Sequence, residues 1–177
     1  MNWFTLSFKS YRQCIKSLIT PREIVETVHH IDFDSLYQKG YRTIFFDVDN
    51  TIMPPEDIKL SLQMENTINS IKNKGFTIFL VSNNSSKRRI KRVCHQLNVQ
   101  GYYFSIKPFP STAFDIRRDH DVVFEETVVV GDQLLTDIIF SNWIDAYGIF
   151  VEPINRNLSF IKTMQRELEL KLIHWLS

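Results

Sequence analysis

The sequence predicts an α/β fold, a Rossmann-like three-layer sandwich in which helices cover both faces of a parallel central sheet of about five strands. Two observations support this prediction. Apolar segments of strand length alternate along the chain with segments of helical periodicity. Polar side chains follow directly after four of the apolar segments, and the carboxyl ends of parallel strands meet at one edge of a sheet. We therefore expect a ligand site at that edge.

Strands are expected where runs of β-branched and aromatic residues end in polar or turn-forming residues. The expected ranges are 43–46, 76–81, 102–106, 127–130 and 147–151. Helices are expected between them, at 62–75 and 85–97, from Pro110 onwards, and around Asp137. Pro21 and Arg22 open a further short segment that we expect to be helical.

Amphipathic helices are expected at both ends of the chain. Residues 1–22 contain basic residues but no acidic residue, and helical spacing gathers apolar side chains on one face, those of Phe4, Phe8, Tyr11, Ile15 and Leu18. Such a helix either lies on an anionic membrane surface or packs on its own domain, and acid-poor starts also resemble transit peptides. A second apolar stripe, between Ile161 and Trp175, predicts a C-terminal helix. We divide the chain into the basic N-terminal helix, 1–22, and a single domain, 23–177.

The length, composition and net charge are those of an ordinary globular protein and exclude several classes of protein. The chain has 177 residues, 44% of them hydrophobic, and its net charge of +1 excludes a globally basic nucleic-acid binder. Cys14 and Cys94 have no metal or redox spacing and are expected to be free thiols of a reducing compartment. No apolar run reaches the ~18 residues of a membrane span, and Lys9 and Arg12 interrupt any secretory signal. A cytoplasmic location is expected, with peripheral contact at the inner membrane face as an extension of it.

The stretch from Thr43 to Thr51 carries the strongest chemical signal. Its apolar run ends in Asp47, and Asp49 and Thr51 follow at intervals of two, so their side chains can share one face. Two carboxylates aimed at one point repel each other unless a cation or a proton lies between them. Mg²⁺, which prefers oxygen ligands, is the expected cofactor. The alternative is a strand that ends in an ordinary turn, where Asp and Asn are common.

Polar residues after the other strands complete a site suited to phosphoryl transfer. They are Ser82, Asn83, Lys107, Asp132 and, in the following helix, Asp137. A carboxylate nucleophile, a hydroxyl group and a lysine without a glycine-rich loop suit a reaction through an aspartyl-phosphate. The sequence has no Gly-x4-Gly-Lys-Ser/Thr loop, no Gly-x-Gly-x-x-Gly turn and no His-Cys-Cys zinc set. It therefore lacks the motifs expected of a kinase, a dehydrogenase or a deaminase. His29 and His30 are adjacent and are not expected to share a metal ion.

Each residue has an expected role in such a reaction. Asp47 attacks phosphorus while it holds the metal, and Asp49 protonates the leaving oxygen and then activates water. Ser82 is expected to hydrogen-bond to a transferring oxygen. Further substrate contacts are expected from a hydroxyl, an amide and a cation, those of Thr51, Asn83 and Lys107. The expected metal ligands are Asp47, Asp49, Asp132 and Asp137, the last either as a ligand or as a support for one.

These motifs, in this order, resemble those of the haloacid-dehalogenase-type phosphatase superfamily. The resemblance is carried by Asp47-Val-Asp-Asn-Thr51, Ser82-Asn-Asn84, Lys107-Pro108 and Gly131-Asp132 with Asp137. Together with Leu18-Ile-Thr-Pro21 and Val151-Glu-Pro-Ile154, they make the chain similar to the YqeG-type, subclass IIIA branch. That branch includes mitochondrial and plastid phosphatases of phosphatidylglycerophosphate. The resemblance implies that Asp47 is the nucleophile and Asp49 the acid/base, and that Mg²⁺ binds Asp47, Asp132 and the Asp49 carbonyl.

The spacing of the motifs predicts the kind of substrate. Asp47 and Ser82 are 35 residues apart, and Ser82 and Lys107 are 25 apart, so neither interval has room for a sizeable cap domain. An uncapped site cannot close over a small metabolite, but it accepts a phosphate that protrudes from a larger structure. A lipid head group, that of phosphatidylglycerophosphate, is the expected substrate. The alternatives are a polynucleotide 3′-end, a nucleotide or a sugar phosphate, or a non-catalytic phospho-binding scaffold.

Five basic residues between Lys87 and Arg92 follow the Ser82 motif. Near the phosphate site they would steer an anionic head group or a membrane surface. A nucleic-acid backbone is the less favoured partner, because the segment lacks an aromatic platform apart from Tyr102 and Tyr103. The third interpretation is a solvated helix face, and no partner protein is predicted from the sequence.

Overall fold

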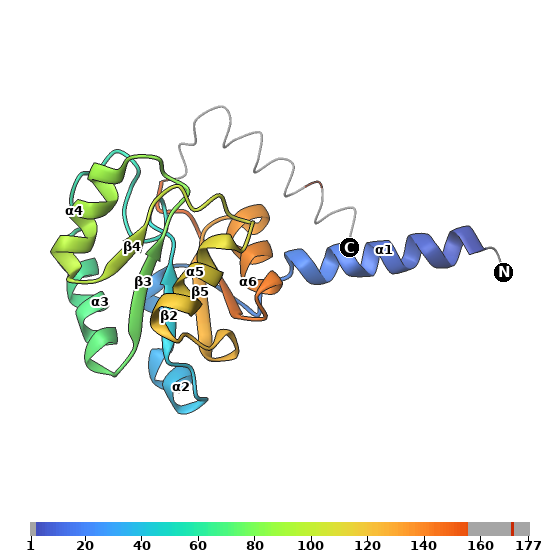
Figure 1. The fold of residues 1–177 in the computed structure, drawn as a ribbon, viewed down its shortest axis with the longest axis horizontal. Coiled ribbons are helices and arrows are strands. Elements are labelled where there is room, and N and C mark those ends of the chain that lie inside the picture. The colour runs from blue at the N-terminus through green and yellow to red at the C-terminus, as the bar shows by residue number, and fades with distance from the viewer. Residues whose placement is uncertain (1–2, 156–170, 172–177) are drawn as a thin grey trace.

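The computed structural model describes residues 3–155 and Lys171, in which helices flank a six-stranded parallel sheet (Figure 1). The strands are β1 (Glu23–Val25), β2 (Thr43–Phe46), β3 (Thr77–Val81), β4 (Gln100–Tyr102), β5 (Thr127–Gly131) and β6 (Tyr147–Val151). Their order is β1-β6-β5-β2-β3-β4, and every neighbouring pair is parallel. The carboxyl end of β2 therefore lies between those of β3 and β5. The predicted α/β class with a parallel sheet is confirmed.

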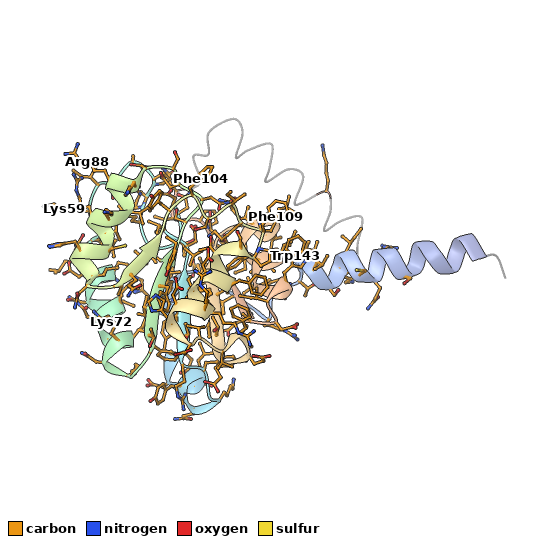
Figure 2. The ribbon with its side chains drawn as sticks, in the orientation of Figure 1. Lys59, Lys72, Arg88, Phe104, Phe109 and Trp143 are labelled. Carbon is orange, nitrogen blue, oxygen red and sulfur yellow. The ribbon has the colours of Figure 1, made fainter. Side chains whose placement is uncertain are left out.

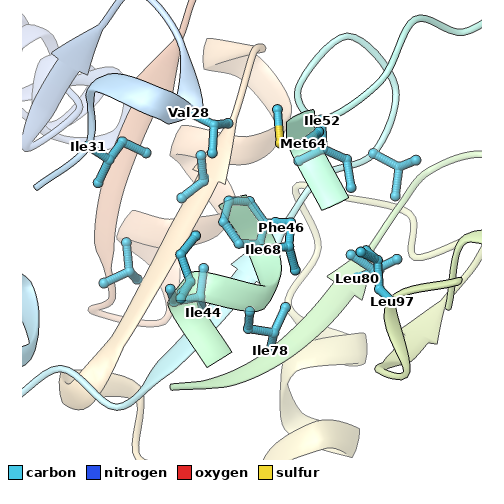
Figure 3. Packing of buried hydrophobic residues seen from close by; sticks show 14 of the residues in the cluster. Val28, Ile31, Ile44, Phe46, Ile52, Met64, Ile68, Ile78, Leu80 and Leu97 are labelled. Atoms are coloured by element: carbon cyan, nitrogen blue, oxygen red, sulfur yellow. The ribbon is translucent and has the colours of Figure 1, made fainter. Parts of the chain in front are cut away.

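Helices pack on both faces of the sheet and close its two larger apolar clusters. Side chains of β2 alternate between them, because Ile44 and Phe46 face the first cluster and Phe45 faces the second. The first cluster (Figure 3) is closed by α2 (Phe33–Gln38), α3 (Leu62–Asn73) and α4 (Lys87–Leu97). The second is closed by α5 (Ser111–His120) and α6 (Ile139–Trp143). Short helical turns are η1 (Val28–His30), η2 (Phe124–Glu126) and η3 (Leu134–Ile138).

The starts of α3 and α4 lie at the carboxyl edge of the sheet, because each helix follows a parallel strand. Ser61 and Ser86 cap them, since their hydroxyl oxygens accept hydrogen bonds from Met64 N and Arg89 N. Gly75 ends the turn after α3 with a φ of 101°, a backbone conformation that glycine adopts at little cost. Local sequence thus brings the first turn of α4 to the edge where the site is expected.

Two strands differ from the sequence prediction. The segment after Pro21 forms the edge strand β1, paired with β6, rather than a helix, so the sheet has six strands. The predicted strand over 102–106 is also wrong in its bounds, because β4 ends at Tyr102. Phe104 and Ile106 both have a φ of 53°, which a strand does not accommodate. The chain therefore leaves the sheet at Tyr102 and turns over its edge.

α1 (Trp3–Ile19) is helical as predicted and projects away from the layered part of the molecule (Figure 1). Its C-terminal end is fixed to α6, because the Asn142 amide donates to the carbonyl oxygens of Ser17, Leu18 and Thr20 at 3.1, 2.7 and 3.1 Å. In the part of the chain that the structure describes, no helix has the length and apolar character needed to cross a bilayer.

The intervals that a cap domain would occupy are short. Between β2 and β3 lie the loop 47–61 and α3, and between β3 and β4 lies α4, all within described residues. The predicted C-terminal helix falls outside the described residues, apart from the exposed Lys171. The division of the chain at residue 22 stays a prediction.

Candidate active site

Lys107 joins two carboxylates at the carboxyl edge of the sheet. Its Nζ donates to Asp47 Oδ1 at 2.7 Å and to Asp137 Oδ1 at 2.6 Å, across sequence separations of 60 and 30 residues. Asp47 follows β2, Lys107 lies in the loop after β4, and Asp137 lies in η3. All three side chains are buried. The strand order therefore assembles one charged network from three separate segments that follow β2, β4 and β5.

Asp47, Asp132 and Asp137 form a cluster that could hold a metal ion. One carboxylate oxygen of each lies within 4.8 Å of the others, and all three residues are buried. Three buried carboxylates repel one another, so a cation between them is favoured, and such oxygen donors fit Mg²⁺. The Asp49 carboxylate is not part of this cluster. A metal contact from Asp49 stays a prediction and concerns its backbone carbonyl.

The surroundings of Asp47 set its charge. Burial raises the pKa of Asp47 to about 6, against the lowering effect of the Lys107 charge. At neutral pH the carboxylate is therefore mainly ionised. Lys107 contacts its Oδ1, whereas its Oδ2 lies 3.3 Å from the Thr51 hydroxyl. Thr51 Oγ1 also lies 3.5 Å from Asp132 Oδ1, so its single proton serves one carboxylate at a time.

Asn83 fixes the loop that carries Lys107. Its Oδ1 accepts a hydrogen bond from Lys107 N at 2.7 Å, and its Nδ2 donates to Lys107 O at 3.0 Å. Burial alone lowers the pKa of Lys107, but the charges of Asp137 and Asp47 outweigh it and the net shift is upward. The ammonium group is therefore held in its charged form. The predicted contact of Asn83 with substrate stays a prediction.

Ser82 lies at the end of β3 and is 1% exposed. Pairing of β2 with β3 brings it to the same edge as Asp47. Its Oγ accepts a hydrogen bond from Asn84 N at 3.1 Å. Its own backbone N donates to Tyr102 O at 2.9 Å, and its carbonyl accepts from Ser105 N at 3.0 Å. These bonds tie Ser82 to the loop that carries Lys107.

Two side chains that the sequence analysis does not assign to the site hold the Asp49 carboxylate. Arg89 Nη2 donates to Asp49 Oδ1 at 2.7 Å, and Asn84 Nδ2 donates to Asp49 Oδ2 at 2.8 Å. The Arg89 guanidinium also donates to the carbonyl oxygens of Pro54 and Asp57. Arg89 thus leaves the solvated face of the basic cluster and ties α4 to the loop after β2. The only sequence signals were its charge and the place of Asn84 in the Ser-Asn-Asn motif.

Gly131 leaves room for Asp137. A Cβ at Gly131 would lie 2.2 Å from Asp137 Cγ, so a side chain there would displace the carboxylate. Asp137 Oδ2 accepts from Gln133 N at 3.1 Å and lies 3.4 Å from Thr136 Oγ1. With Oδ1 bonded to Lys107, both oxygens are engaged. This suits the supporting role, one of the two expected of Asp137.

Comparison with known proteins defines the class to which this fold and site belong. The chain is a phosphoric monoester hydrolase, a phosphatase of the haloacid-dehalogenase type. Within that class it belongs to the family described as mitochondrial PGP phosphatase, whose match covers residues 10–154. The predicted relationship to the YqeG-type branch is confirmed.

Two curated relatives match most of the chain. It is 28% identical over 159 residues to the probable phosphatase YqeG of Bacillus subtilis, across 90% of this chain and 92% of that protein. It is 25% identical over 171 residues to phosphatidylglycerophosphate phosphatase 1, chloroplastic/mitochondrial, of Arabidopsis thaliana. That match covers 91% of this chain and 49% of the longer plant protein.

Solved structures of low sequence identity share the fold. A protein from Listeria monocytogenes serotype 4b has a TM-score of 0.52 at 17% identity, over 73% of this chain and 97% of that one. The cobalt-bound form of the deoxy-D-mannose-octulosonate 8-phosphate phosphatase from Haemophilus influenzae has a TM-score of 0.51 at 14% identity. This second match covers 64% of this chain and 69% of that one.

Proposed function

We propose that the protein hydrolyses the phosphate monoester of phosphatidylglycerophosphate to give phosphatidylglycerol, through an aspartyl-phosphate on Asp47 and with Mg²⁺ as cofactor. The observation that carries this proposal is the Lys107 ammonium group between Asp47 and Asp137 at the sheet edge. The family of the chain and the name of its relative from Arabidopsis thaliana support the choice of lipid.

The proposed roles follow from charge and orientation. Asp47 is ionised at neutral pH, and Lys107 occupies its Oδ1, so Oδ2 is the oxygen that attacks phosphorus. As the new oxygen–phosphorus bond forms, the bond to the leaving oxygen breaks, and Asp49, which enters this step as the protonated carboxylic acid, gives that oxygen its proton and becomes a carboxylate. Lys107 and the Ser82 hydroxyl stabilise the negative charge on the phosphoryl oxygens.

The second half of the proposed reaction returns the enzyme to its starting state. Asp49, now ionised, accepts a proton from water as the water oxygen attacks the phosphorus of the aspartyl-phosphate. Inorganic phosphate leaves and the Asp47 carboxylate is restored. Arg89 and Asn84 hold both oxygens of Asp49, and this keeps its carboxyl group in one orientation for both steps.

Asp47 and Asp132, with Asp137 in support, are the residues that would hold Mg²⁺. A bound Mg²⁺ supplies electrostatic stabilisation to the phosphoryl group and lowers the repulsion between the attacking carboxylate and the substrate. Cobalt, another divalent cation, is bound by the structurally similar phosphatase from Haemophilus influenzae, and this supports a divalent metal here.

The direct test is Mg²⁺-dependent phosphate release. Phosphatidylglycerophosphate in mixed micelles is compared with nucleotides, sugar phosphates and 3′-phosphorylated oligonucleotides, and Asp47→Asn serves as the blank. We expect a strong preference for the lipid that is abolished in the blank. Activity confined to soluble substrates would contradict the proposed lipid substrate but not the proposed mechanism. Undiminished release by Asp47→Asn would remove the mechanism itself.

A further inference from the structure

A band of exposed apolar side chains borders the proposed active site. It consists of Tyr103, Phe104, Ile106 and Phe109 in the loop after β4, and of Trp143 at the end of α6; we call these five residues the apolar rim. Their exposed fractions run from 39% to 62%. Figure 2 shows Phe104, Phe109 and Trp143 following one another along the side of the molecule that leads from α4 to α1. A contiguous apolar band of this kind marks an interaction surface.

The apolar rim and the proposed active site share one loop. Along it the side chains alternate, because Phe104 and Ile106 are 62% and 51% exposed, whereas Ser105 and Lys107 are 1% and 5% exposed. The segment that inserts Lys107 between two carboxylates thus turns its apolar side chains outward. A binding partner whose surface covers the apolar rim would therefore lie directly outside the proposed active site.

Phe104 and Ile106 hold this arrangement at a cost to the backbone. Both have a φ of 53°, a region that residues with a Cβ avoid, β-branched residues most of all. Asparagine suits this region better and would also remove exposed apolar surface. At these two positions a polar residue such as asparagine would lower both the backbone strain and the exposed apolar area. The presence of Phe and Ile there points to a function for the apolar surface.

Basic residues adjoin the rim at the start of α4. Lys87 Nζ lies 5.6 Å from the centroid of the Tyr103 ring, so the two features are in contact. The first turn of α4 has no acidic residue and begins with the exposed Lys87 and Arg88, whereas the charge of the following Arg89 is paired with Asp49. The positive end of a helix dipole favours acidic side chains, so these cations oppose it. The start of α4 therefore suits an anionic partner.

At its other end the rim meets α1. The Phe109 and Trp143 rings lie 5.9 Å apart between centroids, and the adjacent Asn142 holds the C-terminal turn of α1. The sequence of α1 contains basic residues and no acidic residue. Cations thus stand on both sides of an apolar band, the pattern of a surface whose apolar side chains enter a bilayer interface while its cations meet anionic head groups.

We infer that the apolar rim, flanked by the first turn of α4 and by α1, is the surface on which this protein docks to an anionic lipid bilayer, with the proposed active site facing the head groups. The inference deepens the proposed function and rests on it for the substrate, whereas docking is measured without catalysis. A second copy of the chain is the competing occupant, but the flanking cations of the two copies would repel each other.

The test is co-sedimentation of the full chain with phosphatidylcholine vesicles that contain phosphatidylserine, an anionic lipid that is neither substrate nor product of the proposed reaction. The double variant Phe104→Asn with Ile106→Asn removes apolar surface, and asparagine preserves the left-handed backbone of the loop. We expect binding to weaken by about tenfold or more, while hydrolysis of soluble p-nitrophenyl phosphate and the melting temperature do not fall. Val123→Asn, at a 46% exposed residue ahead of β5, is the matched control and should bind as the parent does.

Trp143 reports the same contact directly. In the full chain with Trp3→Phe and Trp175→Phe, Trp143 is the one remaining tryptophan. Brominated phosphatidylcholine in these vesicles should quench its fluorescence, and the double variant should abolish the quenching. Vesicle binding that survives the double variant, or binding without quenching, would overturn the inference. The inference would also be overturned if the parent protein bound no vesicles and instead formed a dimer that the double variant dissociates. Rim-dependent binding without phosphatase activity on any substrate would contradict the proposed function instead.

Discussion

At the scale of single residues, Lys107 balances the charges of the site. It is buried between Asp47 and Asp137 and is bonded to one oxygen of each. Removing one partner of a buried ionic network leaves the remaining charges poorly solvated and facing one another. Lys107 is therefore expected to stabilise the fold as well as the proposed transition state.

Lys107→Met tests this role in stability, because methionine fills similar space without the charge. We expect the free energy of unfolding in urea to fall by about 3–5 kcal/mol at neutral pH. A raised pKa of Asp47 means that this carboxyl stabilises the fold at low pH and loses that contribution as pH rises through about 6. Without the lysine charge the pKa rises further, so the deficit should shrink in acid. Lys87→Met, at an exposed lysine, is the control. A loss of unfolding free energy in Lys107→Met that is the same at all pH values would contradict the account.

Arg89 permits a test that depends on the leaving group. Arg89→Ala removes one of the two side chains that orient Asp49, the proposed acid. The kcat/KM for an alkyl phosphate, whose leaving oxygen needs a proton, should fall by about tenfold to a hundredfold. The kcat/KM for p-nitrophenyl phosphate reports the steps up to the aspartyl-phosphate and should be little affected, because its leaving group needs no proton. Arg89→Lys should recover part of the loss, and Arg88→Ala, at the exposed neighbour, should behave as the parent. Equal losses of kcat/KM on both substrates would contradict the role of Arg89 in positioning the proposed acid.

The convergence of the residues proposed to carry the chemistry was predictable from the sequence, whereas the side chains that support them were not. Asp47, Lys107 and Asp132 follow apolar runs, and parallel strand ends converge whatever the details of packing. Arg89 could not be assigned, because its contact with Asp49 depends on how α4 is rotated against the loop after β2. No local pattern encodes that rotation.

At the scale of elements, the sequence prediction failed for the shortest strands. β1 has three residues and no buried run, and it forms because β6 offers an edge with which to pair. In β4, a Cβ at Gly101 would lie 2.4 Å from Cys94 Sγ, so glycine lets α4 approach the strand closely. The aromatic residues after Tyr102 have high strand propensity, but the left-handed backbone at Phe104 ends the strand. Tertiary packing decides both cases, and propensity does not.

The junction of α1 and α6 gives a prediction at this scale. Asn142→Ala removes the donor shared by the last carbonyl oxygens of α1. Loss of a hydrogen bond of this kind costs about 1 kcal/mol, so amide exchange at the end of α1 should become faster by roughly fivefold. Activity on soluble p-nitrophenyl phosphate should not change. Asn73→Ala, at the exposed end of α3, is the control; unchanged exchange in Asn142→Ala would contradict this view of the junction.

At the scale of the whole molecule, the acidic cluster should couple folding to metal binding. Mg²⁺ is expected to raise the melting temperature relative to EDTA, because it relieves repulsion among Asp47, Asp132 and Asp137. The pKa of Asp47 is about 6, so in acid a proton already relieves part of that repulsion and competes with the metal. The gain measured by calorimetry should therefore be larger above pH 7 than near pH 5. Asp132→Asn should reduce it, and a gain that is independent of pH would contradict this coupling.

The whole architecture also explains why the proposed substrate is a large one. The loop 47–61, α3 and α4 fill the intervals in which a cap would stand, so the described residues place no inserted domain between β2, β3 and β4. The exposed apolar rim beside the carboxyl edge of the sheet is proposed to bind the bilayer, which would cover the site as a cap domain does in other proteins. This arrangement suits a phosphate that a bilayer presents.

The most direct test of the central claim follows the phosphoryl group itself. Phosphatidylglycerophosphate labelled with radioactive phosphorus in its terminal phosphate is mixed with the enzyme and Mg²⁺, quenched in acid within the first turnover, and the protein is digested and mapped. We predict acid-stable label on the peptide that contains Asp47, absent from Asp47→Asn and from samples with EDTA. Turnover of the lipid without label on that peptide, or undiminished turnover by Asp47→Asn, would contradict the account.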